Sequence, residues 1–284
     1  MTLAIVGLGA IGGSFAMRLM KAGYDSIIGI DTDQDTVSYA LEAGIIHTGS
    51  TSAKDLLSEA DVIMLTLYPS QVPAFIEQHR HLFKKNVVLT DVTGIKTSII
   101  RSVHAVLPPD ADFVFAHPMR GSEKKGISGA SVDKFEGANA LITPTDRNKE
   151  ENLQLIESLY RSAGFETLTR VTPEKHDEQI AYVSQLMHAL SVSVVNSEQA
   201  SEDTLLFAGN SFKELTRIAD INVDLWSELF LYNRTALLES IDAFEQELNS
   251  LKKALRSWDE VEPDSSADLK AFLSRSRNQR REWY

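Results

Sequence analysis

The segment AHPMRGSEKKG, residues 116–126, places a histidine directly after an apolar run and before a proline. A histidine can accept a proton near neutral pH, and the end of a strand can present it to a ligand. The residues that follow add a flexible glycine, a hydroxyl and a carboxylate. From these residues alone, His117 is balanced between a catalytic group and a histidine packed at the end of a strand.

A second group of polar side chains lies in HDEQIAYVSQLMHALSV, residues 176–192. Ser184 and Gln185 precede His188 by four and three residues, so all three share one face of a helix. That face is otherwise apolar, which by itself favours a core histidine with a satisfied hydrogen bond. His176 lies near the predicted helix start and could serve as a cap or a hinge. The remaining histidines are in polar contexts that predict solvated side chains: His47, His79, His81 and His104.

Two cations in FKELTRIAD, residues 212–220, could bind an anion. Lys213 and Arg217 are four residues apart and therefore share a helix face next to apolar side chains. In an acidic protein this pair suggests a binding site for a carboxylate. An exposed helix face on which Glu214 pairs with these cations is an equally good interpretation.

A glycine pattern near the amino terminus predicts a cofactor site. VGLGAIGG, residues 6–13, has the G-x-G-x-x-G spacing, follows an apolar run and opens a helical stretch, so the helix N-terminus would face a pyrophosphate. Asp31 ends the next apolar run and would accept hydrogen bonds from the ribose, which favours NAD over NADP because no arginine adjoins it. A turn without a ligand and an FAD site are the alternatives. The predicted cofactor contacts are Gly7, Leu8, Gly9, Ala10, Ile11, Gly12, Asp31, Tyr68, Thr93 and Gly94.

The elements that must position these groups change character near residue 171. Up to that point, short apolar runs alternate with helical stretches, which predicts an α/β fold with a Rossmann-type, doubly wound parallel sheet. Thr172, Pro173 and Glu174 then have the pattern of a helix start, and no convincing strand follows. We therefore expect a dinucleotide-binding domain at residues 1–171 and an all-α substrate and dimerisation domain at residues 172–284.

An apolar seam near the carboxyl end predicts a long helix packed on another helix. Its members are spaced 4, 3, 4, 3 and 4 residues apart: Leu237, Ile241, Phe244, Leu248, Leu251 and Leu255. Such spacing buries one stripe of a helix against a partner helix. A homodimer is the favoured interpretation, because a small helical region rarely buries such a seam alone. An internal helical hairpin is the alternative.

Composition excludes several classes of function. The chain has 284 residues, a net charge of −12 and no cysteine. The negative charge argues against a nucleic-acid partner. The lack of cysteine excludes disulfides, thiolate nucleophiles and thiolate metal sites, and we predict no metal. The first residues do not read as a signal peptide, and no apolar run is long enough to predict a membrane partner, so we expect a cytoplasmic protein.

Four segments together resemble the prephenate dehydrogenase family of tyrosine biosynthesis, over about residues 2 to 255. They are GLGAIGGS, HPMRGSEKKG, HDEQIAYVSQLMH and FKELTRIADINVDLW. The resemblance implies an NAD-dependent oxidative decarboxylation of prephenate to 4-hydroxyphenylpyruvate. Hydride would leave ring carbon C4 for NAD, and loss of CO2 would make the ring aromatic. Arogenate dehydrogenase and a non-catalytic dinucleotide-sensing protein are the alternatives.

The resemblance also implies roles for single residues. His117 would hydrogen-bond the C4 hydroxyl, His188 would orient the substrate, and Arg217 would pair with a substrate carboxylate. Lys213 would assist Arg217 from the neighbouring turn. The family's pocket-lining hydroxyl and gating carboxylate fall on Ser122 and Glu123.

The chain departs from the family pattern at two positions. Gln185 stands where many members have a histidine and is predicted to contact the substrate. Gly94, with Thr93 beside it, stands where many members have a serine that touches nicotinamide and substrate. Neither change removes the predicted proton acceptor or the anion site.

Overall fold

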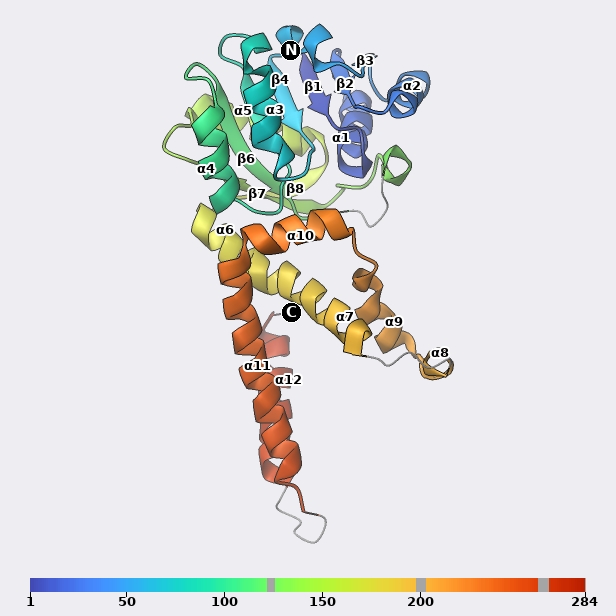
Figure 1. Cartoon of the computed structure of the whole chain (residues 1–284), viewed down its shortest axis with the longest axis vertical. Coiled ribbons are helices and arrows are strands. Elements are labelled where there is room, and N and C mark those ends of the chain that lie inside the picture. The colour runs from blue at the N-terminus through green and yellow to red at the C-terminus, as the bar shows by residue number, and fades with distance from the viewer. Residues whose placement is uncertain (122–125, 198–202, 260–265, 284) are drawn as a thin grey trace. The chain divides into compact units, whose positions relative to one another are not determined.

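An eight-stranded sheet in the order β3-β2-β1-β4-β5-β6-β7-β8 forms the α/β part of the protein (Figure 1). The computed structural model describes residues 1–121, 126–197, 203–259 and 266–283. The strands are β1 (Leu3–Val6), β2 (Ile27–Ile30), β3 (Thr48–Ser50), β4 (Val62–Leu65), β5 (Val88–Asp91), β6 (Asp112–Pro118), β7 (Ala138–Thr143) and β8 (Phe165–Arg170). The first six are parallel in the order of a doubly wound dinucleotide fold, so the predicted Rossmann-type architecture is confirmed.

Two strands differ from the expected parallel series. β7 runs antiparallel to β6, with Phe115 opposite Thr143. A parallel neighbour needs a crossover connection, usually a helix, and between these strands the described residues contain only the short 3-10 turn η4 (Ile127–Gly129). β3 was not predicted, because Thr48, Gly49 and Ser50 form a short edge strand without an apolar pattern.

Helices cover both faces of the sheet. They are α1 (Ala10–Lys21), α2 (Gln34–Glu42), α3 (Gln71–His79), α4 (Thr97–Val106) and α5 (Glu150–Ser162). Side chains alternate along β1, so that Ile5 joins the apolar layer of α1 and α5 while Val6 joins that of α3 and α4. His79 is only 8% exposed, so the prediction that it is solvated is wrong. It closes the apolar face of α3 and lies against Phe75, and burial lowers its pKa.

The chain is helical from residue 173 onward in every described segment. These helices are α6 (Pro173–Ile180), the π-helical turn η5 (Ala181–Gln185), α7 (Leu186–Ser197), α8 (Thr204–Phe207), α9 (Asn210–Thr216), the 3-10 turn η6 (Arg217–Ala219) and α10 (Val223–Tyr232). The hydroxyl of Thr172 accepts from the Lys175 amide at 3.3 Å and Pro173 occupies the first turn, which confirms the predicted helix start. The boundary predicted at residue 171 coincides with the passage from β8 to α6 and stays a prediction as a domain boundary.

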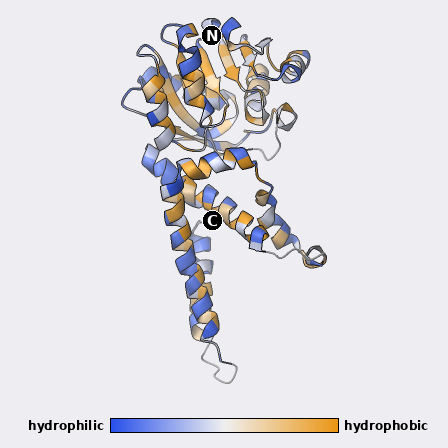
Figure 2. Ribbon diagram, viewed as in Figure 1, coloured by the Kyte–Doolittle hydropathy of each residue, from blue (hydrophilic) through white to orange (hydrophobic). Residues whose placement is uncertain are grey.

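Residues Thr235–Tyr284 form a compact unit separate from Met1–Arg234. Its helices are α11 (Arg234–Arg256) and α12 (Ala267–Trp283), and Arg275 forms an ion pair with Glu247. α11 carries the whole predicted apolar seam, which Figure 2 shows as hydrophobic patches along an otherwise polar helix. Leu248 and Leu255 remain 42% and 54% exposed, so the single chain leaves part of the seam uncovered. Within the described residues, no helix is long and apolar enough to cross a membrane.

Candidate active site

A cavity of about 630 Å³ lies at the carboxyl ends of the central strands. This edge, beside the point where the strand order reverses between β1 and β4, is where doubly wound sheets bind their ligands. The cavity brings together Gly9 of the glycine loop, Gly94 after β5 and His117 of β6. His188 of α7 and Trp226 of α10 line it from the helical part. Segments far apart in the sequence therefore converge here.

The glycine loop has the geometry of a pyrophosphate site. A Cβ atom built at Gly12 would lie 2.0 Å from the carbonyl oxygen of Gly7, so no other residue fits without moving the backbone. Gly7 has a φ of +92°, which side chains other than glycine rarely adopt. At Gly9 a Cβ atom would meet nothing within 4 Å, and no side chain caps α1. The free first turn and the open space fit an anionic cofactor group.

The carboxylate of Asp31 braces this loop. One oxygen accepts from the Leu8 amide at 2.7 Å and the other from the Asp33 amide at 3.0 Å. Asp31, Leu8 and Gly7 do not line the cavity, whereas the other predicted cofactor contacts do: Gly9, Ala10, Ile11, Gly12, Tyr68, Thr93 and Gly94. The predicted contact of Asp31 with a ribose hydroxyl stays a prediction.

The hydroxyl of Thr93 lies beside the position, Gly94, where the family resemblance implies a serine in many members. Thr93 is buried, and its hydroxyl hydrogen-bonds the carboxylate of Asp91 and accepts from the ammonium of Lys96 at 3.2 Å. The hydroxyl is therefore already occupied by buried partners, although Thr93 also lines the cavity. A Cβ atom at Gly94 would lie 3.6 Å from Nε2 of His117, so this glycine leaves that ring nitrogen open to a ligand.

A fully buried ion pair fixes the strand that carries His117. The ammonium of Lys96 donates to the carboxylate of Asp91 at 2.8 Å, to the carbonyl of Ala116 at 2.8 Å and to that of Thr93 at 2.9 Å. These three acceptors, with the Thr93 hydroxyl farther away at 3.2 Å, satisfy the three N–H groups of a protonated lysine. Asp91 also accepts from the Ala116 amide at 3.0 Å. The backbone immediately before His117 is thus held on both its N–H and C=O sides.

His117 forms the first link of a chain of hydrogen bonds. Its Nδ1 lies 2.9 Å from Nε2 of His176, and Nδ1 of His176 lies 2.8 Å from the carboxylate of Asp177. Burial, with smaller effects of His176 and Lys96, holds the pKa of His117 well below its usual range. His117 is therefore neutral at pH 7 and can accept a proton or a hydrogen bond from a ligand.

Sequence reasoning missed the roles of His176 and Asp177. His176 is fully buried and contacts His117, while Thr172 caps α6, so the interpretation of His176 as a cap is wrong. Burial also lowers the pKa of His176, although its hydrogen bond to Asp177 acts in the other direction. A histidine followed by an aspartate at the start of a helix was the available signal, but the partner 59 residues away was visible only in the fold.

On the helical side, His188 lies in the cavity wall as predicted. Its ring stacks on Trp226 with 3.6 Å between ring centroids, and its Nδ1 donates to the carbonyl of Ser184 at 2.9 Å. Its Nε2 is therefore an acceptor. Gln185 lines the same wall but is 1% exposed, and its amide donates to the carbonyl of Leu229 and accepts from Asn233. Gln185 thus ties η5 to α10, and its contact with substrate stays a prediction.

The predicted anion-binding residues are not gathered in the cavity. Arg217 and Lys213 are exposed on η6 and α9 and do not line it. Arg120, which sequence reasoning passed over although it is three residues after His117, does line it. Ser122 and Glu123 lie outside the described residues. Within the described part of the chain no group of side chains could hold a metal ion.

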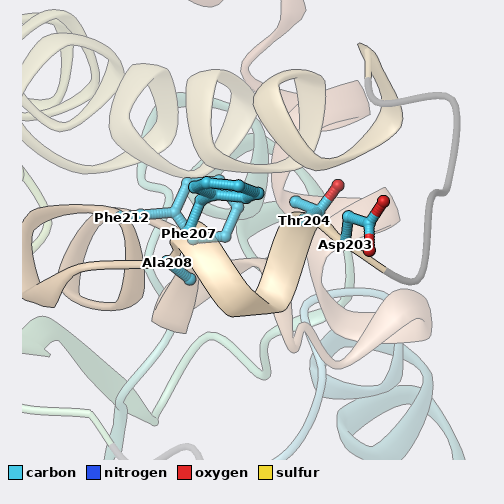
Figure 3. Close-up of a pocket in the computed structure, with 5 residues that line it drawn as sticks. All are labelled: Asp203, Thr204, Phe207, Ala208 and Phe212. Atoms are coloured by element: carbon cyan, nitrogen blue, oxygen red, sulfur yellow. The ribbon is translucent and has the colours of Figure 1, made fainter.

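A second, smaller hollow of about 380 Å³ lies at α8 (Figure 3). Its walls are the side chains of Asp203, Thr204, Phe207, Ala208 and Phe212. Figure 3 shows the two phenylalanine rings close together, with the carboxylate of Asp203 at the other end. Among the described residues that line this hollow there is no cation and no histidine, so they offer no anion site.

Comparison with known proteins gives a consistent result. Residues 15–168 match the nucleotide-binding domain and residues 172–267 the dimerisation domain of prephenate dehydrogenases. The prephenate dehydrogenase of Bacillus subtilis is 27% identical over 264 residues, which are 91% of this chain and 71% of that protein. The predicted cofactor-binding domain is confirmed by the first of these matches.

Solved structures agree over the whole chain. A crystal structure of Aquifex aeolicus prephenate dehydrogenase in complex with hydroxyphenyl propionate and NAD+ superposes with a TM-score of 0.90 at 27% identity, covering 100% of this chain and 99% of that one. The Synechocystis arogenate dehydrogenase superposes with a TM-score of 0.82 at 25% identity, covering 100% of both chains. With both of its family domains matched in order, the chain belongs to the prephenate dehydrogenase family.

Proposed function

We propose that this protein oxidises and decarboxylates prephenate to 4-hydroxyphenylpyruvate, with NAD as the cofactor. One observation carries the proposal: the neutral ring of His117 turns its Nε2 into the same cavity that the glycine loop lines. A proton acceptor thus stands beside a dinucleotide site, as the oxidation of an alcohol requires. The neutral state of His117, set mainly by burial, supports this role at pH 7.

In the proposed reaction His117 accepts the proton of the C4 hydroxyl and later returns it. Its Nε2 accepts the hydrogen bond of the C4 hydroxyl and takes the proton as hydride leaves the ring carbon. Bound NAD supplies the hydride acceptor for this step. When the ring carboxylate departs as CO2, the electron pair of its bond makes the ring aromatic and His117 returns the proton to the oxygen. The proton is borrowed and given back, so the balanced reaction releases none.

Recognition of the substrate requires cations that pair with its carboxylates and side chains that orient its ring. Arg120 lines the cavity and can pair with one of the two substrate carboxylates. Arg217 and Lys213 stay the partners that the family resemblance implies. The stacked pair of His188 and Trp226 offers a flat surface and one acceptor nitrogen beside the ring of the substrate.

We propose that the protein acts as a homodimer. The match of residues 172–267 to a dimerisation domain supports this, as do large apolar side chains that the single chain leaves in solvent. Leu206 and Phe207 are 80% and 85% exposed. Burial of such side chains contributes about 1.5–3 kcal/mol each. A cytoplasmic location stays a prediction.

Arogenate is the second candidate substrate, because an arogenate dehydrogenase superposes over the full chain. Arogenate has the same ring and hydroxyl, so His117 would have the same role. The two substrates differ only in the side chain, which carries a keto group in prephenate and an amine in arogenate.

The decisive test follows NADH formation with prephenate and with arogenate, each in the presence of NAD and of NADP. We expect prephenate with NAD to give the highest kcat/KM. His117→Asn should lower kcat by about 10² or more while the affinity for NAD stays within about twofold. Turnover of neither substrate would overturn the proposed function. Near-normal turnover by the asparagine variant would overturn the role of His117 alone.

A further inference from the structure

We propose that His176 and Asp177 are positioning residues for His117, which fix its tautomer and share the proton that it borrows from the substrate. This inference rests on the proposed function and deepens it. It assigns a role to a buried histidine and a buried carboxylate that belong to a different segment from His117.

The donor and the acceptor of each hydrogen bond follow from the carboxylate of Asp177. A carboxylate only accepts hydrogen bonds, so the bond at 2.8 Å requires a proton on Nδ1 of His176. In the neutral ring of His176, Nε2 is then an acceptor. The bond at 2.9 Å therefore requires a proton on Nδ1 of His117. Nε2 of His117 is left with a lone pair, and this is the nitrogen beside Gly94 that faces the cavity. The chain thus selects the tautomer that can receive a proton from a hydroxyl.

The carboxylate of Asp177 is held in its ionised, correctly oriented state by the start of α4. Its Oδ1 accepts from the Lys96 amide and its Oδ2 from the Thr97 amide, each at 2.8 Å. A helix N-terminus favours a negative charge at this place. Burial alone would raise the pKa of Asp177, but the hydrogen bonds from His176 and Thr97 outweigh it and lower the pKa.

The surroundings explain why a second base is needed. Asp91 at the end of β5 and Lys96 just before α4 lie near the two histidines, and His176 and Asp177 belong to α6. Burial and the nearby ammonium of Lys96 oppose a positive charge on both rings, but only at His176 do the hydrogen bond to Asp177 and the charges of Asp177 and Asp91 act in the other direction. When Nε2 of His117 gains the substrate proton, the proton on its Nδ1 can pass to Nε2 of His176. The positive charge then lies on the ring adjoining the Asp177 carboxylate, and both shifts reverse when the proton is returned.

The first test uses the unaltered, ligand-free protein. Ring-¹⁵N-labelled histidine allows NMR to record which nitrogen of each imidazole carries the proton. We expect His117 and His176 both to be neutral at pH 7.5 with the proton on Nδ1. A proton on Nε2 of His117 would overturn the proposal, whatever the enzyme turns over. The NMR result therefore tests the role of His176 and Asp177 independently of whether the protein turns over prephenate.

The second test compares two substitutions of His176. His176→Gln places an amide oxygen near the former Nε2, so it can accept from His117 but cannot take a proton, whereas His176→Leu can do neither. We expect kcat to fall by about 10-fold with glutamine and about 100-fold with leucine, with KM and NAD affinity within about twofold. In the leucine variant the NMR spectrum should lose the single tautomer of His117.

A matched control separates this role from general damage. His79 is also a buried histidine, but it lies on α3 and hydrogen-bonds neither His117 nor His176. His79→Gln should keep wild-type kcat. A kcat within about twofold of wild type in His176→Leu would overturn the proposal. A joint loss of NAD binding and of the folded CD spectrum in His176→Gln would also count against it, because it would indicate a structural role only.

Discussion

The two ends of the cavity are built in different ways. At the cofactor end the space depends on the backbone of one short stretch, residues 7–12, because its glycines have no side chains. The proton-accepting end is made of side chains, and its links His117, His176 and Asp177 come from segments 59 residues apart. In the glycine loop the missing side chains are what allow a cofactor to approach the backbone. In the histidine chain the direction of each hydrogen bond decides which ring nitrogen can accept a proton.

This difference decides how each end tolerates change. A loop that depends on backbone geometry has no side chain to repack, so one added methyl group disturbs it. A chain of side chains can lose one member and keep its fold, because its neighbours retain other hydrogen bonds. Asp177, for example, still holds the amides of α4 when His176 is replaced.

The largest effect is expected at Gly12. In Gly12→Ala the new methyl group would lie 2.0 Å from the Gly7 carbonyl oxygen, so the loop must move and NAD affinity should fall more than about 100-fold. In Gly9→Ala nothing lies within 4 Å of the methyl group, so the fold should be intact and NAD affinity should fall only about 10-fold. Calorimetric titration with NAD measures both. Equal affinities in the two variants would contradict the backbone model of this end.

A smaller effect is expected when the anion partner is removed. Arg120 lines the cavity and Arg217 does not, although the family resemblance implies a role for Arg217. We expect Arg120→Ala to raise the KM for substrate by about 10-fold, which is what one exposed charge-assisted contact supplies, with kcat little changed. The KM of Arg217→Ala, measured in parallel, shows which of the two arginines pairs with the substrate. A larger rise in KM for Arg217→Ala would show that the single chain leaves that arginine away from its working position.

The smallest effect near neutral pH concerns stability. The pKa of His117 and that of His176 are lowered in the folded chain, so below pH 6.5 the unfolded chain binds more protons than the folded one. The free energy of unfolding should be flat above pH 7 and should fall as the pH drops below 6.5, with a slope of up to about 1.4 kcal/mol per pH unit for each such group.

Urea unfolding at a series of pH values tests this. His117→Asn should make the decline below pH 6.5 shallower, because one group that titrates between the two states is gone. The unaltered protein, measured in parallel, supplies the reference slope. An unchanged slope in the His117 variant would mean that this histidine can be protonated in the folded protein at little cost.

The same contrast explains what the sequence predicted well. The glycine loop, the strands of the parallel sheet and the helix start at Thr172 are local patterns, and the structure contains all of them. His117 was placed correctly because the end of a parallel strand has a defined position at the sheet edge. The prediction that His79 is solvated failed because its polar neighbours in the sequence are not its neighbours in the fold.

What could not be predicted depends on pairs distant in the sequence. The link between His117 and His176 exists only because β6 and α6 meet, and the reversal of β7 has no signature in its own residues. Gln185 is predicted to contact substrate because it stands where many family members have a histidine, and that contact stays a prediction. The structure adds that its amide oxygen accepts from Asn233, 48 residues later, a partner that no helical spacing could reveal.

The carboxylate of Asp177 has a structural role and a role in the hydrogen-bond chain of the site. Its two oxygens cap the start of α4, and Oδ1 also ends the chain that begins at His117. Selection therefore acts on this one codon both for the stability of α4 and for the hydrogen bond to His176. A lineage that substitutes this residue must replace a helix cap and a base partner in the same step, and single mutations rarely offer both. We therefore expect this aspartate to change more slowly in descendants of this protein than either function alone would require.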